Sequence, residues 1–369
     1  MKKAIALILA LVMVFALCAC GSSAPAPAPE APAAPAEAPA EETPAEEAPA
    51  EVKDTKVYEF NMSCHESATS GQAMAIEPWV KALDEASDGR IKVTVYYGAA
   101  LAAPNEELAM VENGAIDLCW NTTTIISDRF KANNVMGLPM LTGYTESING
   151  TKAIQDLYNE CEAVHDEFDF IHLVALHATS LNPLSTSFEI TKPEDLNGLR
   201  VRTTNPCCIN FLENLGCVPT SFTVADSYEN MSKHVVDGLL NDWTNMSANK
   251  IWEVAPYTCN ISAGFATGFV AMNLDSYNSM SDEVRAIFDE VSADLGMALG
   301  EQFENNNVNG PSKSEEAGGK VYLPDDTTMA YMKEAAQKTW DWWVASMNEQ
   351  GYDAQGLLDK ALEVLARYN

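Results

Sequence analysis

The sequence predicts an α/β protein built from two compact units, and three observations support this prediction. Its 369 residues exceed the length of one average domain and are enough for two units that each bury a core. From Val57 onward, strand-like runs alternate with helix-like runs. Between residues 57 and 121 the order is strand, helix, strand, helix, strand, which is typical of a parallel sheet.

The first twenty residues are predicted to be an export signal and not part of the fold. Lys2 and Lys3 precede an apolar run over residues 4–17, which has the length of a signal-peptide core. The run ends in "LCACGSS", where small residues lead into Cys20. This pattern resembles a bacterial lipobox, so Cys20 is the expected site of lipid attachment. An ordinary secretion signal is the alternative.

Residues 21–56 are predicted to form an extended linker. From residue 24 to residue 51 the sequence is almost entirely alanine, proline and glutamate, without large apolar side chains that could build a core. Such a chain stays extended, and about thirty residues at about 3.1 Å each reach about 100 Å. We therefore expect a stalk between the lipid anchor and the folded units.

The charge of the chain excludes some classes of partner. The formal net charge is -31, from 22 basic and 53 acidic residues. Leaving out the two lysines of the signal and the seven glutamates of the linker still leaves 20 basic and 46 acidic residues. A surface this negative disfavours nucleic acid and anionic lipid head groups. An anionic solute can bind only where the site itself is positive.

The cysteines and histidines do not form a known catalytic or metal-binding pattern. Seven cysteines follow the signal, an odd number without paired short spacings, so we expect buried thiols and no metal. The sequence contains no HExxH spacing, GxSxG elbow or Walker loop. We therefore expect neither an enzyme nor a cofactor.

The elements of the first unit follow from the period of the apolar residues. We expect strands at 57–62, 90–98 and 115–121, with helices at 76–89 and 104–113 between them. Pro78 either weakens the first helix or marks its first turn. A further strand at 170–180 precedes the second unit.

The second unit is predicted to begin with a short helical turn at 191–198 and a strand at 199–204. A helix at 205–216 follows, with Asn205 as its cap, Pro206 at its first position and Gly216 just past its end. Residues 226–236 are predicted to be helical and residues 237–243 extended.

Arg200 and Arg202 lie in "LNGLRVRTTNPCC", on the strand before that capped helix. Ligands of open α/β sheets bind at the carboxyl ends of the strands, and the helix N-terminus adds positive potential there. The forked donors of arginine suit a carboxylate. Equally, both arginines could be solvated or paired with surface acids. Strand periodicity places both on one face, so it does not choose between them.

Several segments in order resemble one protein family. They are "TKPEDLNGLRVR", "LGCVPTSFTVADSYENMSKHVVDG" and "GFVAMNLDSYNSMSDEVRAIFDEV". The similarity continues in the N-terminal half, in "EPWVKALDEASDGRIKVTVYYGAAL", "VENGAIDLCWN" and "GLPML". Together they resemble the DctP-type extracytoplasmic solute-binding proteins of tripartite ATP-independent periplasmic (TRAP) transporters, from about residue 57 to the end.

The resemblance implies a two-lobed, Venus-flytrap fold in which the chain crosses between the lobes more than once. The first lobe would comprise residues 57–178 with about 268–307, and the second lobe 179–267 with about 308–369. It also implies a long helix that bridges both lobes, which suits the stretch from residue 281 to about 307.

The resemblance also implies ligand-binding residues. Family members commonly clamp an organic anion through the arginine that matches Arg202, whereas Arg200 matches a variable basic position. A polar residue after the "VDG" turn often lines the site, which points to Asn241. Many members read "DGQENP" where this chain reads "DGLLNDW", which makes Trp243 a candidate aromatic wall.

Four further residues are candidates for the site, each with a structural alternative. Trp120 and Asn121 end a predicted strand and should reach the rim of the site, unless Trp120 belongs to the core. His65 follows the first strand, where family members place a ligand-facing loop, or it is an ordinary loop histidine. His177 lies near the expected lobe crossing and contacts either ligand or a hinge.

The implied function is capture of a small organic anion and its delivery to a TRAP membrane permease that is driven by an ion gradient. We expect a monomer outside the cytoplasm that touches the membrane only through its lipid anchor and binds no nucleic acid. An ABC-type or sensory binding lipoprotein is the alternative. The order of the lobes and the bridging helix favour the TRAP interpretation.

Overall fold

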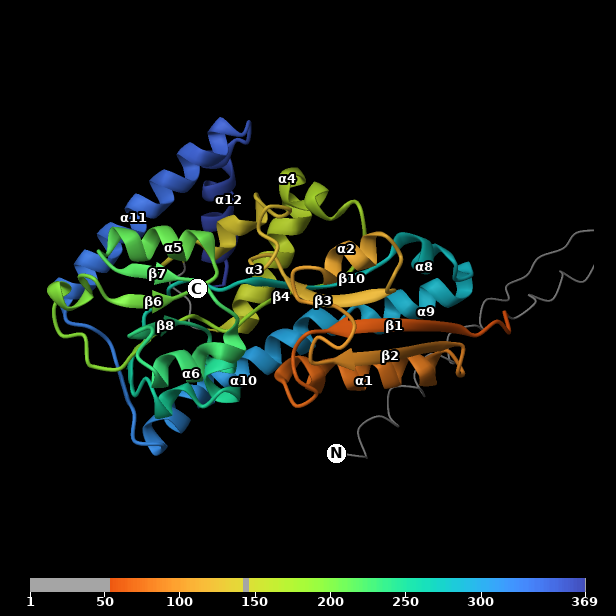
Figure 1. Cartoon of the computed structure of the whole chain (residues 1–369). Coiled ribbons are helices and arrows are strands. Elements are labelled where there is room, and N and C mark those ends of the chain that lie inside the picture. Colours follow the sequence, from red (N-terminus) through yellow and green to blue (C-terminus); the bar gives the residue numbers. More distant parts are fainter. Residues whose placement is uncertain (1–53, 142–145, 369) are drawn as a thin grey trace, which may run out of the picture. The chain divides into compact units, whose positions relative to one another are not determined.

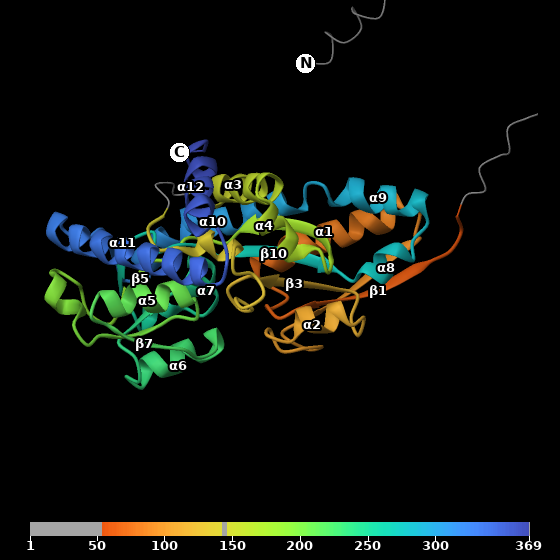
Figure 2. The ribbon, with the colours of Figure 1, turned by 90° about the horizontal axis from the view of Figure 1, so that it is seen from above.

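The computed structural model describes residues 54–141 and 146–368 (Figures 1 and 2). Cys20, the predicted signal and nearly all of the predicted linker lie outside these residues. The described part holds two β-sheets flanked by helices, which confirms the predicted α/β class. Within it, no helix is both long and apolar enough to cross a membrane.

The first sheet has five strands in the order β2-β1-β3-β10-β4. These are β1 (Tyr58–Cys64), β2 (Ile91–Tyr97), β3 (Leu118–Thr122), β4 (His172–Ala178) and β10 (Thr267–Met272). β1 pairs in parallel with both β2 and β3, as the strand and helix alternation predicts. β10 returns from much later in the chain and runs antiparallel between β3 and β4.

The helical elements that accompany this sheet come from two stretches of the chain. They are α1 (Gly71–Ala86), α2 (Glu107–Glu112), η2 (Asn133–Gly137), α3 (Ser147–Glu160), α4 (Glu162–His165), η3 (Asp166–Phe168), α8 (Leu274–Asn278) and α9 (Asp282–Ser292). α1 begins five residues before the predicted start because the Ser70 side chain caps it, accepting from Ala73 N at 3.2 Å. Pro78 therefore lies inside the helix and not in its first turn.

Both faces of the first sheet are buried, and the alternation of side chains along its strands explains how. Leu118 and Trp120 of β3 belong to one apolar cluster, together with helices α1 and α9. Cys119, between them, belongs to a second cluster with α3 and the C-terminal helices. The sheet thus separates two cores, which is usual for sheets with crossover helices on both sides.

The second sheet has six strands of three residues each in the order β11-β9-β5-β8-β6-β7. These are β5 (Leu184–Thr186), β6 (Arg200–Arg202), β7 (Val218–Thr220), β8 (Gly238–Leu240), β9 (Tyr257–Cys259) and β11 (Lys320–Tyr322). β6 is parallel to β7 and β8, whereas β5 is antiparallel to β8 and β9.

Short helical elements connect these strands. They are η4 (Pro193–Leu196), α5 (Pro206–Asn214), η5 (Val224–Asp226), α6 (Ser227–Ser232), α7 (Trp243–Ala248) and η6 (Ile251–Glu253). α5 begins as predicted, because the Asn205 side chain accepts from Cys207 N at 2.9 Å. The extended segment predicted at 237–243 ends early: Asp242 caps α7 by accepting from Asn245 N, so Trp243 is helical.

The chain crosses between the sheets from β4 to β5 and again from β9 to β10. The helix α10 (Leu295–Glu316) contacts α1, α3 and β4 on one side and α7 and β11 on the other. The predicted single helix from 281 to about 307 is wrong in its bounds, because a turn at 293–294 separates α9 from α10. α10 also continues through Pro311.

Glycines let α10 approach both sheets closely. A Cβ on Gly296 would lie 2.4 Å from the Leu176 carbonyl oxygen in β4. A Cβ on Gly310 would lie 2.6 Å from the ring of Trp243 in α7. Backbone or ring atoms therefore occupy the space that a side chain would need.

The last two helices belong to different surroundings. α11 (Asp326–Glu349) packs on α5, whereas α12 (Ala354–Ala366) packs on α3. The lobe boundaries stay a prediction: 57–178 with 268–307 for the first lobe, and 179–267 with 308–369 for the second. With these boundaries, α12 belongs to the second lobe but contacts α3 of the first.

Candidate ligand-binding site

The candidate site lies between the carboxyl ends of strands from both sheets. The first sheet contributes the residues that follow β1 and end β3, and the second contributes those at the ends of β6 and β8. They are His65, Glu66, Trp120, Asn121, Arg202, Asn241 and Asp242. Burial raises the pKa of Glu66 and lowers that of Arg202, and the charge of Asp242 acts on both groups, adding to the first shift and opposing the second. The two edges are therefore within electrostatic range of each other.

Arg202 is a buried cation without a carboxylate partner in the described part of the chain. It is 6% exposed, and its Nε and Nη2 donate to the Phe222 carbonyl oxygen at 3.1 and 2.9 Å. Burial lowers its pKa to about 10, and the charge of Asp242 opposes that shift. The guanidinium also lies 5.9 Å from the centroid of the Phe222 ring. A buried guanidinium whose hydrogen bonds go only to one carbonyl retains donors and charge for an anion.

Arg200, two residues earlier on β6, is already paired. Its Nε donates to Asp237 Oδ2 at 2.8 Å, and its Nη2 donates to Asp237 Oδ1 at 2.7 Å. The side chain is 43% exposed. Its alternative interpretation, an ion pair with a surface acid, is the one the structure supports. The two arginines therefore differ in burial and in partner although they share a strand face.

Asn241 follows β8 and is also incompletely bonded. It is 5% exposed, and its Nδ2 has no hydrogen-bond partner within residues 54–141 and 146–368. Asp242, the next residue, accepts from Asn245 Nδ2 at 2.6 Å and from Ser180 Oγ at 3.3 Å. Burial raises the pKa of Asp242, while these hydrogen bonds oppose that shift. Sequence reasoning missed Asp242, although an aspartate before a helix is a recognisable capping signal.

Trp243 lies in the core of the second unit. It is 2% exposed and packs with Leu239, Ile251 and the backbone of Gly310. The structure therefore gives this ring a packing position under α10, and the predicted aromatic wall has almost no exposed ring surface.

A buried carboxylate organises the first edge. Glu107 is fully buried and accepts from Ser63 Oγ at 2.7 Å, from His65 Nδ1 at 2.7 Å and from Asn121 Nδ2 at 3.0 Å. Asn121 Nδ2 also donates to the Pro104 carbonyl oxygen at 2.7 Å. Two predicted site residues, His65 and Asn121, are thus brought together by a residue that the sequence reasoning did not single out. Nothing local marked Glu107, which looks like an ordinary acid at a helix start.

Trp120 and His177 form a second buried pair at the first edge. Trp120 Nε1 donates to His177 Nε2 at 2.9 Å, and His177 Nδ1 lies 3.0 Å from the Ala178 carbonyl oxygen. Burial lowers the pKa of His177 to about 4, so the ring is neutral, donates from Nδ1 and accepts at Nε2. The Trp120 ring also lies 5.2 Å from the His65 ring. Trp120 and His177 thus bond to each other and help to hold the first edge in place.

Two hollows on the described surface lie away from these residues. One of about 530 Å³ is lined by Lys56, Asp117 and Asn273 near the amino end of β1. The other, of about 200 Å³, is lined by Gln155 and Gly296 between α3 and α10. Neither contains a residue of the candidate site, so we base the site on contacts and charge.

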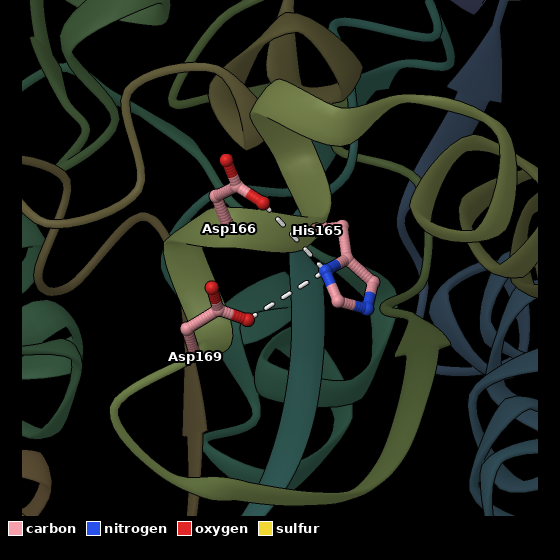
Figure 3. A group of neighbouring side chains, drawn as sticks. All are labelled: His165, Asp166 and Asp169. Carbon is pink, nitrogen blue, oxygen red and sulfur yellow. Dashed lines mark ion pairs between the residues drawn. The ribbon is translucent and has the colours of Figure 1, made fainter.

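One group of metal-ligand type occurs among the described residues, on α4 and η3 (Figure 3). His165 Nδ1 lies 3.8 Å from Asp166 Oδ1 and 3.6 Å from Asp169 Oδ1. All three residues are exposed; Asp166 directly follows His165, and Asp169 lies one helical turn further on. Their proximity is therefore explained by local backbone geometry, and we assign them no metal role.

Comparison with known proteins identifies the family. Residues 60–347 match the family model DctP, bacterial extracellular solute-binding protein, family 7. Outer membrane transporter protein TsaT of Comamonas testosteroni is 22% identical over 295 residues, which are 78% of this chain and 85% of that protein. The C4-dicarboxylate-binding periplasmic protein DctP of Vibrio cholerae is 21% identical over 248 residues, 65% of this chain and 72% of that protein.

Solved structures show the same fold. A marine metagenome TRAP solute binding protein from an unidentified microbe superposes with a TM-score of 0.78 at 23% identity, covering 85% of this chain and 100% of that chain. One from Rhodoferax ferrireducens superposes with a TM-score of 0.76 at 22% identity, covering 85% and 98%. These matches confirm the predicted two-lobed fold. The chain belongs to the DctP family, the bacterial extracellular solute-binding proteins of family 7.

Proposed function

We propose that this chain is the extracytoplasmic solute-binding protein of a TRAP transporter and captures a small organic anion through Arg202. The family is one of substrate-binding transport proteins and not of enzymes. The observation that carries the proposal is the buried guanidinium of Arg202, a residue that is 6% exposed and whose hydrogen bonds within the described chain all go to one carbonyl oxygen. An entering carboxylate or sulfonate would accept hydrogen bonds from the guanidinium donors that the Phe222 carbonyl leaves free.

The relatives support an anionic solute. The marine metagenome protein is specific for aromatic acid ligands, and the Rhodoferax ferrireducens protein holds copurified benzoate. The Vibrio cholerae relative is a C4-dicarboxylate-binding protein. All of these ligands carry a carboxylate, which is the group that a solute of this chain would present to Arg202.

Capture would couple binding to a change in the spacing of the two sheets. The Arg202 edge belongs to the second sheet and the His65 edge to the first, so a solute that contacts both favours the arrangement in which they lie close. The loaded protein would then dock on a membrane permease whose ion gradient drives uptake. We propose that the protein acts as a monomer and needs neither metal nor cofactor for this role.

Attachment to the membrane would come from Cys20 through a lipid, with residues 21–56 as the tether. The support is the charged, apolar and small-residue order of the first twenty residues. Cys20→Ser protein should leave the membrane fraction while its solute affinity stays unchanged. Protein that remains in the pellet after a carbonate wash would contradict the lipid assignment.

A screen followed by titration tests the proposed capture. Thermal-shift screening of benzoate, succinate, glucuronate and related anions identifies ligands, because a ligand that binds only the folded state raises Tm. Arg202→Ala should then weaken binding at least about thirtyfold, since removing one partner of a buried charge pair costs about 2 to 5 kcal/mol. Arg202→Lys keeps the charge without the fork and should recover part of the loss.

Arg200→Ala is the matched control on the same strand. Its side chain is paired and partly exposed, so its removal should change affinity less than about fivefold. Folded Arg202→Ala protein that binds like wild type would remove the central residue of the proposal. A large loss in Arg200→Ala instead would move the anion site to that arginine.

A further inference from the structure

The surroundings of Arg202 carry more negative charge than a simple anion site needs. Three recessed carboxylates interact there: the charges of Asp242 and Glu107 both act on Glu66, and that of Asp242 also acts on Arg202. They come from both edges, since Glu66 follows β1, Glu107 begins α2 and Asp242 caps α7. An approaching monoanion is attracted by one guanidinium and repelled by three carboxylates.

Two of these carboxylates already serve the fold. Glu107 accepts hydrogen bonds from Ser63, His65 and Asn121. Asp242 accepts from the backbone and side chain of Asn245. Their charges remain in the site, but their oxygens hold the ends of β1, β3 and α7 in place.

The third carboxylate, Glu66, is different. Across the described chain no hydrogen bond reaches its side chain, and the nearest ion-pair candidate is the ring of His65, with Nε2 at 3.8 Å from Oε1, which is a cation only when protonated. The side chain keeps 22% exposure. Burial raises the pKa of Glu66, the charge of His65 opposes that shift, and the charges of Asp242 and Glu107 add to it. A positive group beside Glu66 would offset the burial and the repulsion.

Donors without partners occur on the opposite edge. Asn241 is 5% exposed and its Nδ2 lacks a partner among the residues described. Arg202, on the neighbouring strand, donates only to the Phe222 carbonyl. The second edge thus offers donors for a carboxylate, whereas Glu66 on the first edge offers acceptors for a positively charged nitrogen.

We infer that the solute is a zwitterion, such as an amino acid, whose carboxylate binds Arg202 and Asn241 and whose cationic nitrogen binds Glu66. This inference rests on the proposed function and narrows its solute class. Two ends of opposite charge fix the orientation of the solute between the edges. The same carboxylates repel a dianion, or an acid that has no cationic nitrogen. The site would therefore select the zwitterion partly by weakening the binding of these competing solutes.

Matched pairs of small molecules test the inference. Proline and cyclopentanecarboxylate, or phenylalanine and 3-phenylpropanoate, share a skeleton and a carboxylate and differ in the cationic nitrogen. Calorimetric titration of the full folded protein at pH 7 should show the zwitterion of at least one pair binding at least about tenfold more tightly than its plain acid.

Glu66→Gln tests whether Glu66 causes the preference for the zwitterion. The amide keeps the shape but loses the charge, so it should weaken the zwitterion and tighten the plain acid, closing most of the tenfold gap. Glu59→Gln removes an exposed acid from β1, the strand that precedes Glu66, and should leave both affinities unchanged. Circular dichroism confirms that each variant is folded.

The outcomes separate the two proposals. Tighter binding of the plain acids in wild type, or an equal loss of both ligands in Glu66→Gln, would overturn the zwitterion assignment. If plain acids bind and Arg202→Ala abolishes that binding, the proposed function stands and the zwitterion assignment falls. If neither the anion screen nor any pair gives binding, both fall.

Discussion

Two asparagines at corresponding places show how the two edges of the site differ. At the first edge, Asn121 donates to the Pro104 carbonyl at 2.7 Å and to Glu107 at 3.0 Å, and its Oδ1 accepts from Thr122 N at 2.7 Å. At the second edge, the Nδ2 of Asn241 is buried and unbonded within the described chain. At the first edge, the Asn121 side chain is hydrogen-bonded within the fold. At the second edge, Asn241 retains a donor that a solute can use.

The largest expected effect comes from breaking the packing of the first edge. Gly268 pairs with His177 across β10 and β4, and a Cβ there would lie 2.2 Å from His177 Nε2. Gly268→Ala should displace the ring, break its bond with Trp120 and lower the free energy of unfolding by about 3 kcal/mol. Denaturant titration measures this loss.

Gly71→Ala is the control for that variant. Gly71 begins α1, and a Cβ there meets the Gln302 Cβ at 3.3 Å, so the change should be within about 1 kcal/mol of wild type. If Gly268→Ala were equally mild, the His177 ring would be free to move and the first edge would not be a fixed wall.

The asparagine pair gives the next largest effect and tests the comparison directly. Asn121→Ala removes one of the three side chains that donate to the buried Glu107 carboxylate and should lower the free energy of unfolding by about 2 kcal/mol. Asn241→Ala removes an unbonded donor, so the unliganded protein should stay within about 0.5 kcal/mol of wild type or gain stability. Its ligand affinity should fall about tenfold. Equal destabilisation by both variants would show that the edges do not differ.

The smallest effect concerns pH. The pKa of His177 is about 4 in the fold and 6.5 without it, so the unfolded chain binds the proton more readily between these values. Stability from the neutral ring is present at pH 7 and is lost as pH falls. Relative to His177→Gln, wild type should lose about 1.2 kcal/mol between pH 7 and pH 5.5. Parallel stability profiles for the two proteins would mean that His177 is solvated.

The parts of the fold that depend on local sequence were predictable. The strand before α5, the Asn205 cap and the parallel order of the first strands follow from period, capping chemistry and turn residues close together in the chain. Arg202 could be placed at a strand end in the same way. Its burial could not, because strand periodicity treats Arg200 and Arg202 alike and only the fold brings Asp237 to Arg200.

The missed residues depend on contacts between distant parts of the chain. Glu107 becomes a buried network centre because Ser63 and His65, more than forty positions earlier, are folded onto it. Trp243 becomes core because Gly310 of α10 presents bare backbone to its ring. Neither burial nor a partner can be inferred from the residues beside Glu107 or Trp243.

The glycines of α10 have a mechanical consequence. Gly300 seats the helix against Thr151 beside the first sheet, and Gly310 seats it against Trp243 beside the second. Bending of α10 in response to a change in the spacing of the sheets would fall on the ten residues from one contact to the other, about 15 Å of helix. That stretch contains "ENNNVN", and asparagine is a poor helix former. The part of α10 between its contacts at Gly300 and Gly310 is thus the part of this helix where bending costs the least free energy.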